Sequence, residues 1–171
     1  MSFLPIPSQD AIAVAQTYGL WIQTGAICLS AIAALFLVLY SKNIACRRAT
    51  LDLIMAEETD PSHRETRLAF IKLRQKGELV KWAMAEHVGS PETSHIRQVL
   101  NRYELVAIGI KNKTVDENLY KAWCRSTLVK DWTACKSFVT ELRSTTHIMT
   151  VFCECENLAR KWATKEELTH I

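Results

Sequence analysis

Two short groups of residues in the second half of the sequence have side chains that could carry out chemistry. In the first, Arg143-Ser144-Thr145-Thr146-His147, an arginine and a histidine flank three hydroxyl residues. A histidine can act as acid or base at a 2′-hydroxyl, and an arginine can stabilise a phosphate, so the pair would suit RNA cleavage. The same residues equally form a loop arginine beside an exposed histidine. We therefore predict no enzymatic activity and keep Arg143 and His147 as the catalytic candidates.

The second group, Cys153-Glu154-Cys155, is a candidate metal site. Side chains two positions apart on a helix point to different faces, and no histidine lies at ligand spacing beside this pair. The sequence also lacks a Cys-x-x-Cys pair and a Gly-rich phosphate loop. We expect no metal and no cofactor, and we expect Cys135 and Cys155 to fill the core as small apolar side chains.

A third set of polar residues is predicted to be structural. Asn101 and Glu104 lie three positions apart beside an apolar stripe with the helical period. Partly buried groups of this kind require partners, and Arg125 and Arg143 from the following helices are the candidates. We interpret the four residues as a polar clamp that holds the helices in one packing. A catalytic carboxylate would need a second acid or base at a defined spacing, which the sequence does not show.

The elements that position these residues begin with an uncharged segment. No Asp, Glu, Lys or Arg occurs in residues 11–41, and residues 18–40 are almost entirely apolar. As a helix, residues 18–40 would extend roughly 35 Å, enough to cross the hydrocarbon core of a bilayer. A signal peptide would have a basic start and a shorter apolar core. We therefore predict a transmembrane helix over residues 11–41, with a buried core helix as the alternative.

Charges on the two sides of this segment predict its orientation. Lys42, Arg47 and Arg48 follow the segment, whereas Asp10 is the only charged residue before it. Under the positive-inside rule, the N-terminus lies outside and the rest of the chain lies in the cytoplasm. The three basic residues are expected to contact anionic lipid headgroups. A net charge of +3 is too small to indicate nucleic acid as a partner.

One side of the predicted span differs from the rest. Polar side chains recur every seven residues along one line of the helix, and small residues recur along the neighbouring line. This polar stripe consists of Gln16, Gly19, Gln23, Ala26, Ser30 and Ala33. A glutamine amide that faces hydrocarbon leaves hydrogen-bonding groups unsatisfied. The stripe predicts homo-oligomerisation through the span, with a ring around a polar lumen as one form. The alternative is that these residues lie on one side by chance.

The remaining sequence predicts an all-α domain. Apolar residues recur at i, i+3, i+4 and i+7, most regularly in residues 96–110, and no run alternates with the two-residue period of a strand. Asp60-Pro61 is a typical helix start, and Thr114-x-x-Glu117 has the pattern of a capping box. These signals indicate about five helices after the span.

The predicted organisation has five segments. The span is expected to continue without a break into the segment that follows it, because no helix-ending signal separates them. In chain order, the segments are an external N-terminus (1–10), the span (11–41), a basic juxtamembrane helix (42–58), a cytoplasmic helical bundle (59–164) and a frayed tail (165–171).

The order of several features resembles an uncharacterised family of small bacterial proteins. The features are a charge-free span, Arg47-Arg48-Ala49-Thr50-Leu51-Asp52, Leu100-Asn101-Arg102-Tyr103-Glu104 with Ile108-Gly109-Ile110, Trp132, and Phe138-x-x-x-Leu142-Arg143. This family is known as a domain of unknown function with one N-terminal span and a cytosolic helical domain. The resemblance covers most of residues 10–162 and implies the same architecture in a bacterial inner membrane.

More loosely, the architecture is similar to the small membrane accessory protein of type VI-B CRISPR systems. That protein joins an N-terminal span to a degenerate HEPN-like helical domain and assembles as a ring-shaped pore in phage defence. The similarity implies a multimeric effector that depolarises the membrane. HEPN ribonucleases use an Arg and a His at a wider spacing than that of Arg143 and His147.

Three hypotheses follow from these patterns. The first is a single-span protein that self-associates, as a ring or pore in one form, with a cytoplasmic domain that senses or docks a partner. The second is a membrane-tethered scaffold for a soluble protein. The third is a tethered HEPN-like ribonuclease that uses Arg143 and His147. The expected partners are further copies of the chain, anionic lipid headgroups and, under the second hypothesis, a soluble protein.

Overall fold

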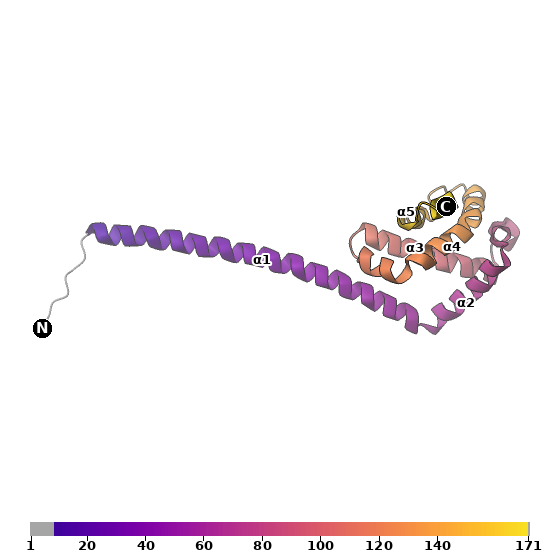
Figure 1. Cartoon of the computed structure of the whole chain (residues 1–171), viewed down its shortest axis with the longest axis horizontal. Coiled ribbons are helices and arrows are strands. Elements are labelled where there is room, and N and C mark those ends of the chain that lie inside the picture. The colour runs from indigo at the N-terminus through magenta and orange to yellow at the C-terminus, as the bar shows by residue number, and fades with distance from the viewer. Residues whose placement is uncertain (1–8, 171) are drawn as a thin grey trace. The chain divides into compact units, whose positions relative to one another are not determined.

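The computed structural model describes the backbone of residues 9–170 and the side chains of residues 18–170 (Figure 1). All the regular secondary structure in this part of the chain is helical, which confirms the predicted all-α class. The elements are α1 (Gln9–Thr59), α2 (Pro61–Lys76), η1 (Leu79–Ala83), η2 (Ala85–His87), α3 (Pro91–Lys111), α4 (Glu117–Thr146), α5 (Cys153–Trp162) and η3 (Glu167–Thr169). The chain divides into two compact units, of which the first ends at Ala45 and the second begins at Cys46.

The first unit is the apolar part of α1. Every side chain in residues 18–45 is exposed, including Trp21, Phe36 and a series of leucines and isoleucines. In the described part of the chain, α1 is the one helix long and apolar enough to cross a membrane. Its length follows from the sequence, because no Pro and no helix-ending turn signal interrupts residues 9–59.

The second unit begins on the last turns of α1. Thr50, Ile54 and Glu57 are buried there, and they share one face of the helix. The helix ends at Thr59 because Asp60 caps the next helix: its Oδ1 accepts a hydrogen bond from the Ser62 backbone N–H at 2.9 Å. The predicted continuation of the span into the juxtamembrane segment is therefore confirmed as one helix.

The core of the second unit is built around α4. This helix packs against η1 and α5, while α3 packs against α2 and α5. The predicted core cysteines Cys135 and Cys155 are both fully buried. The largest fully buried side chains are Trp132, Tyr120, Phe70, Phe138, Ile96, Leu100 and Leu128.

The start of α4 differs from the predicted capping box. Asp116 is the N-cap residue, and its Oδ1 accepts from the Leu119 N–H at 2.9 Å. Thr114 instead donates its hydroxyl to the Gly109 carbonyl at 3.1 Å, which closes the turn after α3. Gly109, near the end of α3, allows this turn to approach closely, because a Cβ there would lie 2.7 Å from a methyl of Val115.

The end of the chain also differs from the prediction. The segment 165–171 was expected to fray, but Glu167–Thr169 forms the short helix η3. Arg125 holds this helix by donating a hydrogen bond to the Glu167 carboxylate. A charged tail with no apolar period thus acquires structure from an arginine about forty positions earlier, which local pattern does not reveal.

We predict that Glu117 makes the fold acid-sensitive. Hydrogen bonds from Lys161 Nζ (2.7 Å) and Trp162 Nε1 (3.0 Å) lower the pKa of the Glu117 carboxyl and join the start of α4 to the end of α5. A lowered folded-state pKa stabilises the fold above the ordinary carboxyl pKa, and that contribution is lost as the pH falls through the folded-state value. Glu117→Gln should therefore cost about 0.5–1 kcal/mol of unfolding free energy at pH 7 and nothing at low pH.

The measurement is urea unfolding of the detergent-solubilised chain between pH 3 and pH 7. Glu65→Gln, at an exposed position of α2, is the matched control and should unfold like the unchanged chain at every pH. An equal loss for Glu117→Gln at both ends of this range would show that its charge does not contribute.

Candidate functional site

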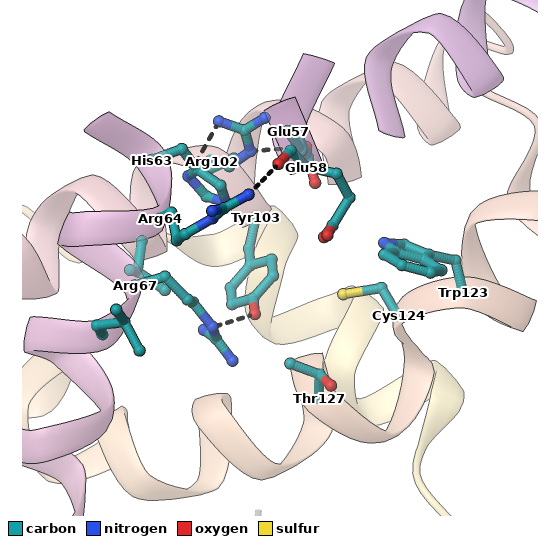
Figure 2. A pocket seen from close by; sticks show the side chains of 12 residues that line it. Glu57, Glu58, His63, Arg64, Arg67, Arg102, Tyr103, Trp123, Cys124 and Thr127 are labelled. Carbon is teal, nitrogen blue, oxygen red and sulfur yellow. Dashed lines mark hydrogen bonds and ion pairs between the residues drawn. The ribbon is translucent and has the colours of Figure 1, made fainter. Parts of the chain in front are cut away.

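The second unit contains a pocket of about 430 Å³ between the end of α1 and helices α2, α3 and α4 (Figure 2). It is the best candidate for a functional site in the described part of the chain, because cationic side chains and one exposed indole converge on it. The lining residues are Glu57, Glu58, His63, Arg64, Arg67, Leu68, Val99, Arg102, Tyr103, Trp123, Cys124 and Thr127.

A fully buried carboxylate, that of Asp131 on α4, lies behind the pocket wall. Arg67 and Arg74, which lie about two turns apart on α2, donate hydrogen bonds to its two oxygens. Tyr103 Oη donates to Asp131 Oδ2 at 2.8 Å and accepts from Arg67 Nη1 at 3.1 Å. Burial, together with the negative charge of Asp131, raises the pKa of Tyr103, so the phenol stays neutral and can donate. These four residues are called the Asp131 network below.

A second ion pair forms the wall next to α1. Glu57, which is 7% exposed, lies 2.6 Å from Arg102 Nε on α3 and accepts a hydrogen bond from Tyr120 Oη at 3.4 Å. Arg102 Nη1 also lies 3.3 Å from His63 Nδ1. Burial lowers the pKa of Arg102, and a guanidinium nevertheless stays charged at neutral pH. Arg64 Nη2 donates to the Glu58 backbone carbonyl at 3.3 Å.

The opposite side of the pocket is formed by α4. Figure 2 shows Trp123 across the hollow from Arg64 and Arg67. Trp123 is 51% exposed, so its indole is accessible to a ligand. Burial raises the pKa of Cys124, which keeps its thiol protonated and unsuited to act as a nucleophile.

This arrangement is suited to binding rather than to proton transfer. Both buried carboxylates, Glu57 and Asp131, are held by arginines, which leaves neither in the role of a free base. The hydrogen bonds of Arg67 within the described residues all use Nη1, so its Nε and Nη2 remain able to donate into the pocket. Three arginines line the pocket and Arg74 lies behind its wall, whereas only three carboxylates are nearby, those of Glu57, Glu58 and Asp131. The excess of positive charge therefore favours an anionic group in the pocket.

The structure does not bring the four residues of the predicted polar clamp together. Glu104 does not contact Arg125 or Arg143; its carboxylate accepts from the backbone N–H of Cys155 at 2.7 Å and thereby caps the start of α5. Asn101 is exposed. The sequence places Glu104 on the right face of α3, but it does not say which donors that face will meet.

The two clamp arginines bind the flanks of α5. Arg125 Nε donates to the Trp162 carbonyl at the end of α5 at 3.0 Å. Arg143 Nε donates to the Val151 carbonyl just before α5 at 3.0 Å, and its Nη1 lies 2.8 Å from Glu156. Burial works against the charged form of Glu156, but hydrogen bonds from Arg143 and Arg160 outweigh it and lower the pKa.

The catalytic candidates are not assembled into a site. His147 ends α4 in a left-handed conformation (φ 55°) and is exposed, while Arg143 is engaged with Glu156. Neither residue lines the pocket. The structure thus places Arg143 in a packing role, as the α4–α5 connection requires.

The polar stripe can be described from Gly19 onward, since the side chain of Gln16 lies outside the described residues. Gly19, Gln23, Ala26, Ser30 and Ala33 are all exposed on α1. The Ser30 hydroxyl donates to the Ala26 carbonyl of its own helix at 2.8 Å. The Gln23 side chain is exposed, and its amide makes no hydrogen bond within the described residues.

The predicted headgroup residues lie on both sides of the boundary between the units. Lys42, in the first unit, is exposed. In the second unit Arg48 is exposed, and Arg47 Nε lies 3.8 Å from Asp116 at the start of α4 with its side chain 63% exposed. All three charges therefore remain available to solvent or to headgroups.

Sequence reasoning missed the Asp131 network and the pocket. One signal was available: Asp131 interrupts the apolar period around Leu128, Trp132 and Cys135, and a charge at that place needs a buried partner. The identity of the partners is a tertiary fact, because Arg67 lies 64 positions earlier in the sequence.

The model of a family described as a domain of unknown function, DUF4760, matches residues 24–162. The chain belongs to this family. The matched segment contains most of the apolar run and every residue that lines the pocket. No curated protein and no solved structure matches the chain. The expected kinship to an uncharacterised family is confirmed, whereas the looser similarity to the CRISPR accessory protein finds no support in these comparisons.

We predict that removing the buried carboxylate collapses the Asp131 network. Asp131→Ala leaves Arg67 and Arg74, with side chains 21% and 16% exposed, without their counter-charge. The free energy of unfolding should fall by about 3–5 kcal/mol, since an uncompensated buried charge is costly. Urea unfolding monitored by circular dichroism measures this.

A second variant separates charge from packing. Replacing both arginines with methionine in the Asp131→Leu background should recover most of the lost stability, because an apolar replacement of a buried ion pair is nearly neutral. Glu78→Gln, an exposed member of a surface pair with Lys81, is the control and should leave the midpoint almost unchanged. A small effect of Asp131→Ala would contradict the described network.

Proposed function

We propose that the protein is a single-span membrane protein that self-associates through residues 11–41 and holds a ligand-binding helical domain in the cytoplasm. The observation that carries the proposal is that every apolar side chain in residues 18–45 is exposed. Leaving each leucine, isoleucine or phenylalanine in water costs about 1.5–3 kcal/mol. A lipid bilayer removes this cost over the whole circumference of the helix.

The orientation rests on charge. Lys42, Arg47 and Arg48 follow the apolar run, and basic residues near a span favour the cytoplasmic side. In a bacterium the span would lie in the inner membrane. The helical domain would then face the cytosol, where its free cysteines stay reduced.

Self-association is supported by the unmet amide of Gln23. Hydrocarbon offers no hydrogen bonds, so the amide is satisfied by another helix, by a second protein or by water. The small residues Ala26 and Ala33 beside it allow helix backbones to approach closely. A further copy of the same helix brings both the amide and the small residues.

A conducting ring is the second candidate, favoured by the seven-residue spacing of Gln16, Gln23 and Ser30. The Ser30 hydroxyl already has an acceptor in its own helix, and so does that of Thr24, which donates to the Leu20 carbonyl at 2.8 Å. The glutamines are then the residues of the stripe that still need hydrogen-bond partners. Two such residues favour close packing of helices over a continuous water-filled lumen. Ion conductance across planar bilayers separates the two forms.

The domain supports a sensing or docking role through its pocket. Arg64, Arg67 and Arg102 favour an anion, and the half-exposed Trp123 favours a planar ring in the same ligand. We infer that the pocket takes a small molecule that carries both groups. A soluble protein that presents them would use the same site, which keeps the scaffold hypothesis in view.

We expect the detergent-solubilised particle to contain more than one chain. The double substitution Gln16→Leu with Gln23→Leu should weaken association roughly 3- to 30-fold, because an interhelical hydrogen bond in a membrane contributes about 0.6–2 kcal/mol. Light scattering coupled to size exclusion gives the mass across a range of detergent concentrations. Thr24→Val, which removes a hydroxyl that is satisfied within its own helix, is the matched control. A single-chain mass for the unchanged protein would refute self-association.

We expect adenosine monophosphate to bind more tightly than either adenosine or ribose 5-phosphate, since it carries both the ring and the anion. Calorimetric titration should give a gain of about tenfold over each fragment. Trp123→Ala should remove the contribution of the ring, and Arg64→Gln that of the phosphate. Arg97→Gln, an exposed arginine elsewhere on α3, is the control. Equal binding of the three probes, or no binding of any, would refute the inferred ligand class.

A further inference from the structure

The last turns of α1 leave one face uncovered. Between Cys46 and Thr59, the helical domain buries Thr50, Ile54 and Glu57 on one side of the helix. On the other side Leu51 is 50% exposed and Met55 is 61% exposed. Two large apolar side chains one helical turn apart on an open helix face are typical of a surface that packs against another helix.

These residues fall into a seven-residue repeat. With Met55 at position a and Leu51 at position d of the heptad, Arg48 is also an a residue and Ile44 is also a d residue. The same register continues upstream through the apolar run. There the a positions hold Leu20, Ile27 and Ala34, and the d positions hold Gln23, Ser30 and Leu37. The exposed line of a and d residues from Leu20 to Met55 is called the seam below.

The domain lies on the outer side of this register. Thr50 and Glu57 occupy c positions and Leu53 an f position, which are the positions that face away from the partner in a coiled coil. Ile54 is a g residue at the edge of the buried face. The domain therefore covers α1 without covering Leu51 or Met55.

We propose that a second copy of the chain binds along the seam, parallel and in register, as a coiled coil that extends from the span to Met55. This inference rests on the proposed self-association and adds its geometry, its polarity and its extension beyond the span. It makes the juxtamembrane part of α1 a contact between copies.

The charges at e and g positions favour the parallel arrangement, at the cost of placing the two copies of Arg48 at facing a positions. Arg47 is a g residue and Asp52 is the e residue five positions later, which is the offset that pairs across a parallel coiled coil. The Arg47 side chain is 63% exposed and Asp52 is exposed, so both can reach a partner. In an antiparallel pair, g residues face g residues, and the two copies of Arg47 would repel.

Lipid cannot cover the C-terminal part of the seam, which contains Leu51 and Met55. Leu51 lies eleven residues after Tyr40, the end of the apolar run, which is about 16 Å along a helix. The headgroup region on each side of a bilayer is only about 5–8 Å thick. Leu51 and Met55 therefore emerge into water unless a protein surface covers them.

Disulfide trapping in the full chain tests the proposal. In a background with Cys28→Ala and Cys46→Ala, we compare Leu51→Cys and Met55→Cys on the seam with Ala49→Cys, an exposed b position on the outer side. After mild oxidation in liposomes, the two seam variants should form at least about ten times more covalent dimer than Ala49→Cys. Because all three positions are exposed, none of the changes disturbs the core. Equal trapping at the three positions, or more at Ala49, overturns the seam.

Particle mass separates this outcome from a failure of the proposed function. A multi-chain particle without trapping at Leu51 or Met55 overturns the seam and leaves association through the span intact. A single-chain particle overturns both. A charge exchange then tests the polarity: Asp52→Arg should lower trapping at Leu51, and adding Arg47→Asp should restore it, whereas failure to restore it overturns the parallel register.

Discussion

The apolar length of α1 has no protein surface to lie against, and this constraint shapes the whole chain. A helix with residues 18–45 exposed is unfavourable in water, because the cost per large apolar side chain is about 1.5–3 kcal/mol. Backbone groups within a helix are already paired, so a bilayer accepts the segment without further change. The Gln23 amide on the same segment is exposed and makes no hydrogen bond within the described residues.

The second unit holds charged side chains inside a small helical core. Asp131 is fully buried, yet all its strong interactions are supplied by Arg67, Arg74 and Tyr103. A buried ion pair adds little net stability compared with apolar packing, but breaking one is costly. The network therefore fixes how α2, α3 and α4 meet. Arg67, one of the two arginines that bind Asp131, also lines the pocket, so the network and the pocket share a residue.

The local sequence pattern predicts much more of the fold than of the site. The uncharged run, the Asp60 cap and the apolar period were enough to predict an all-α chain and one long first helix. What they could not give is the partner of each polar group. Glu104 was placed on the correct face of α3, but its role as the cap of α5 depends on backbone donors fifty positions later. Arg143 looked catalytic by composition, and only packing shows that Glu156 engages it.

Within the second unit, the end of α1 carries both a wall residue of the pocket and an uncovered apolar side chain. Glu57 lies on the last turn of α1 and pairs with Arg102 in the pocket wall, whereas Leu51, less than two turns earlier, points away from the domain. A ligand anion that competes for Arg102 would loosen Glu57 and with it the attachment of the helix end to the domain. Such a ligand can shift association between copies only by the difference between its affinity for the associated chain and its affinity for the single chain.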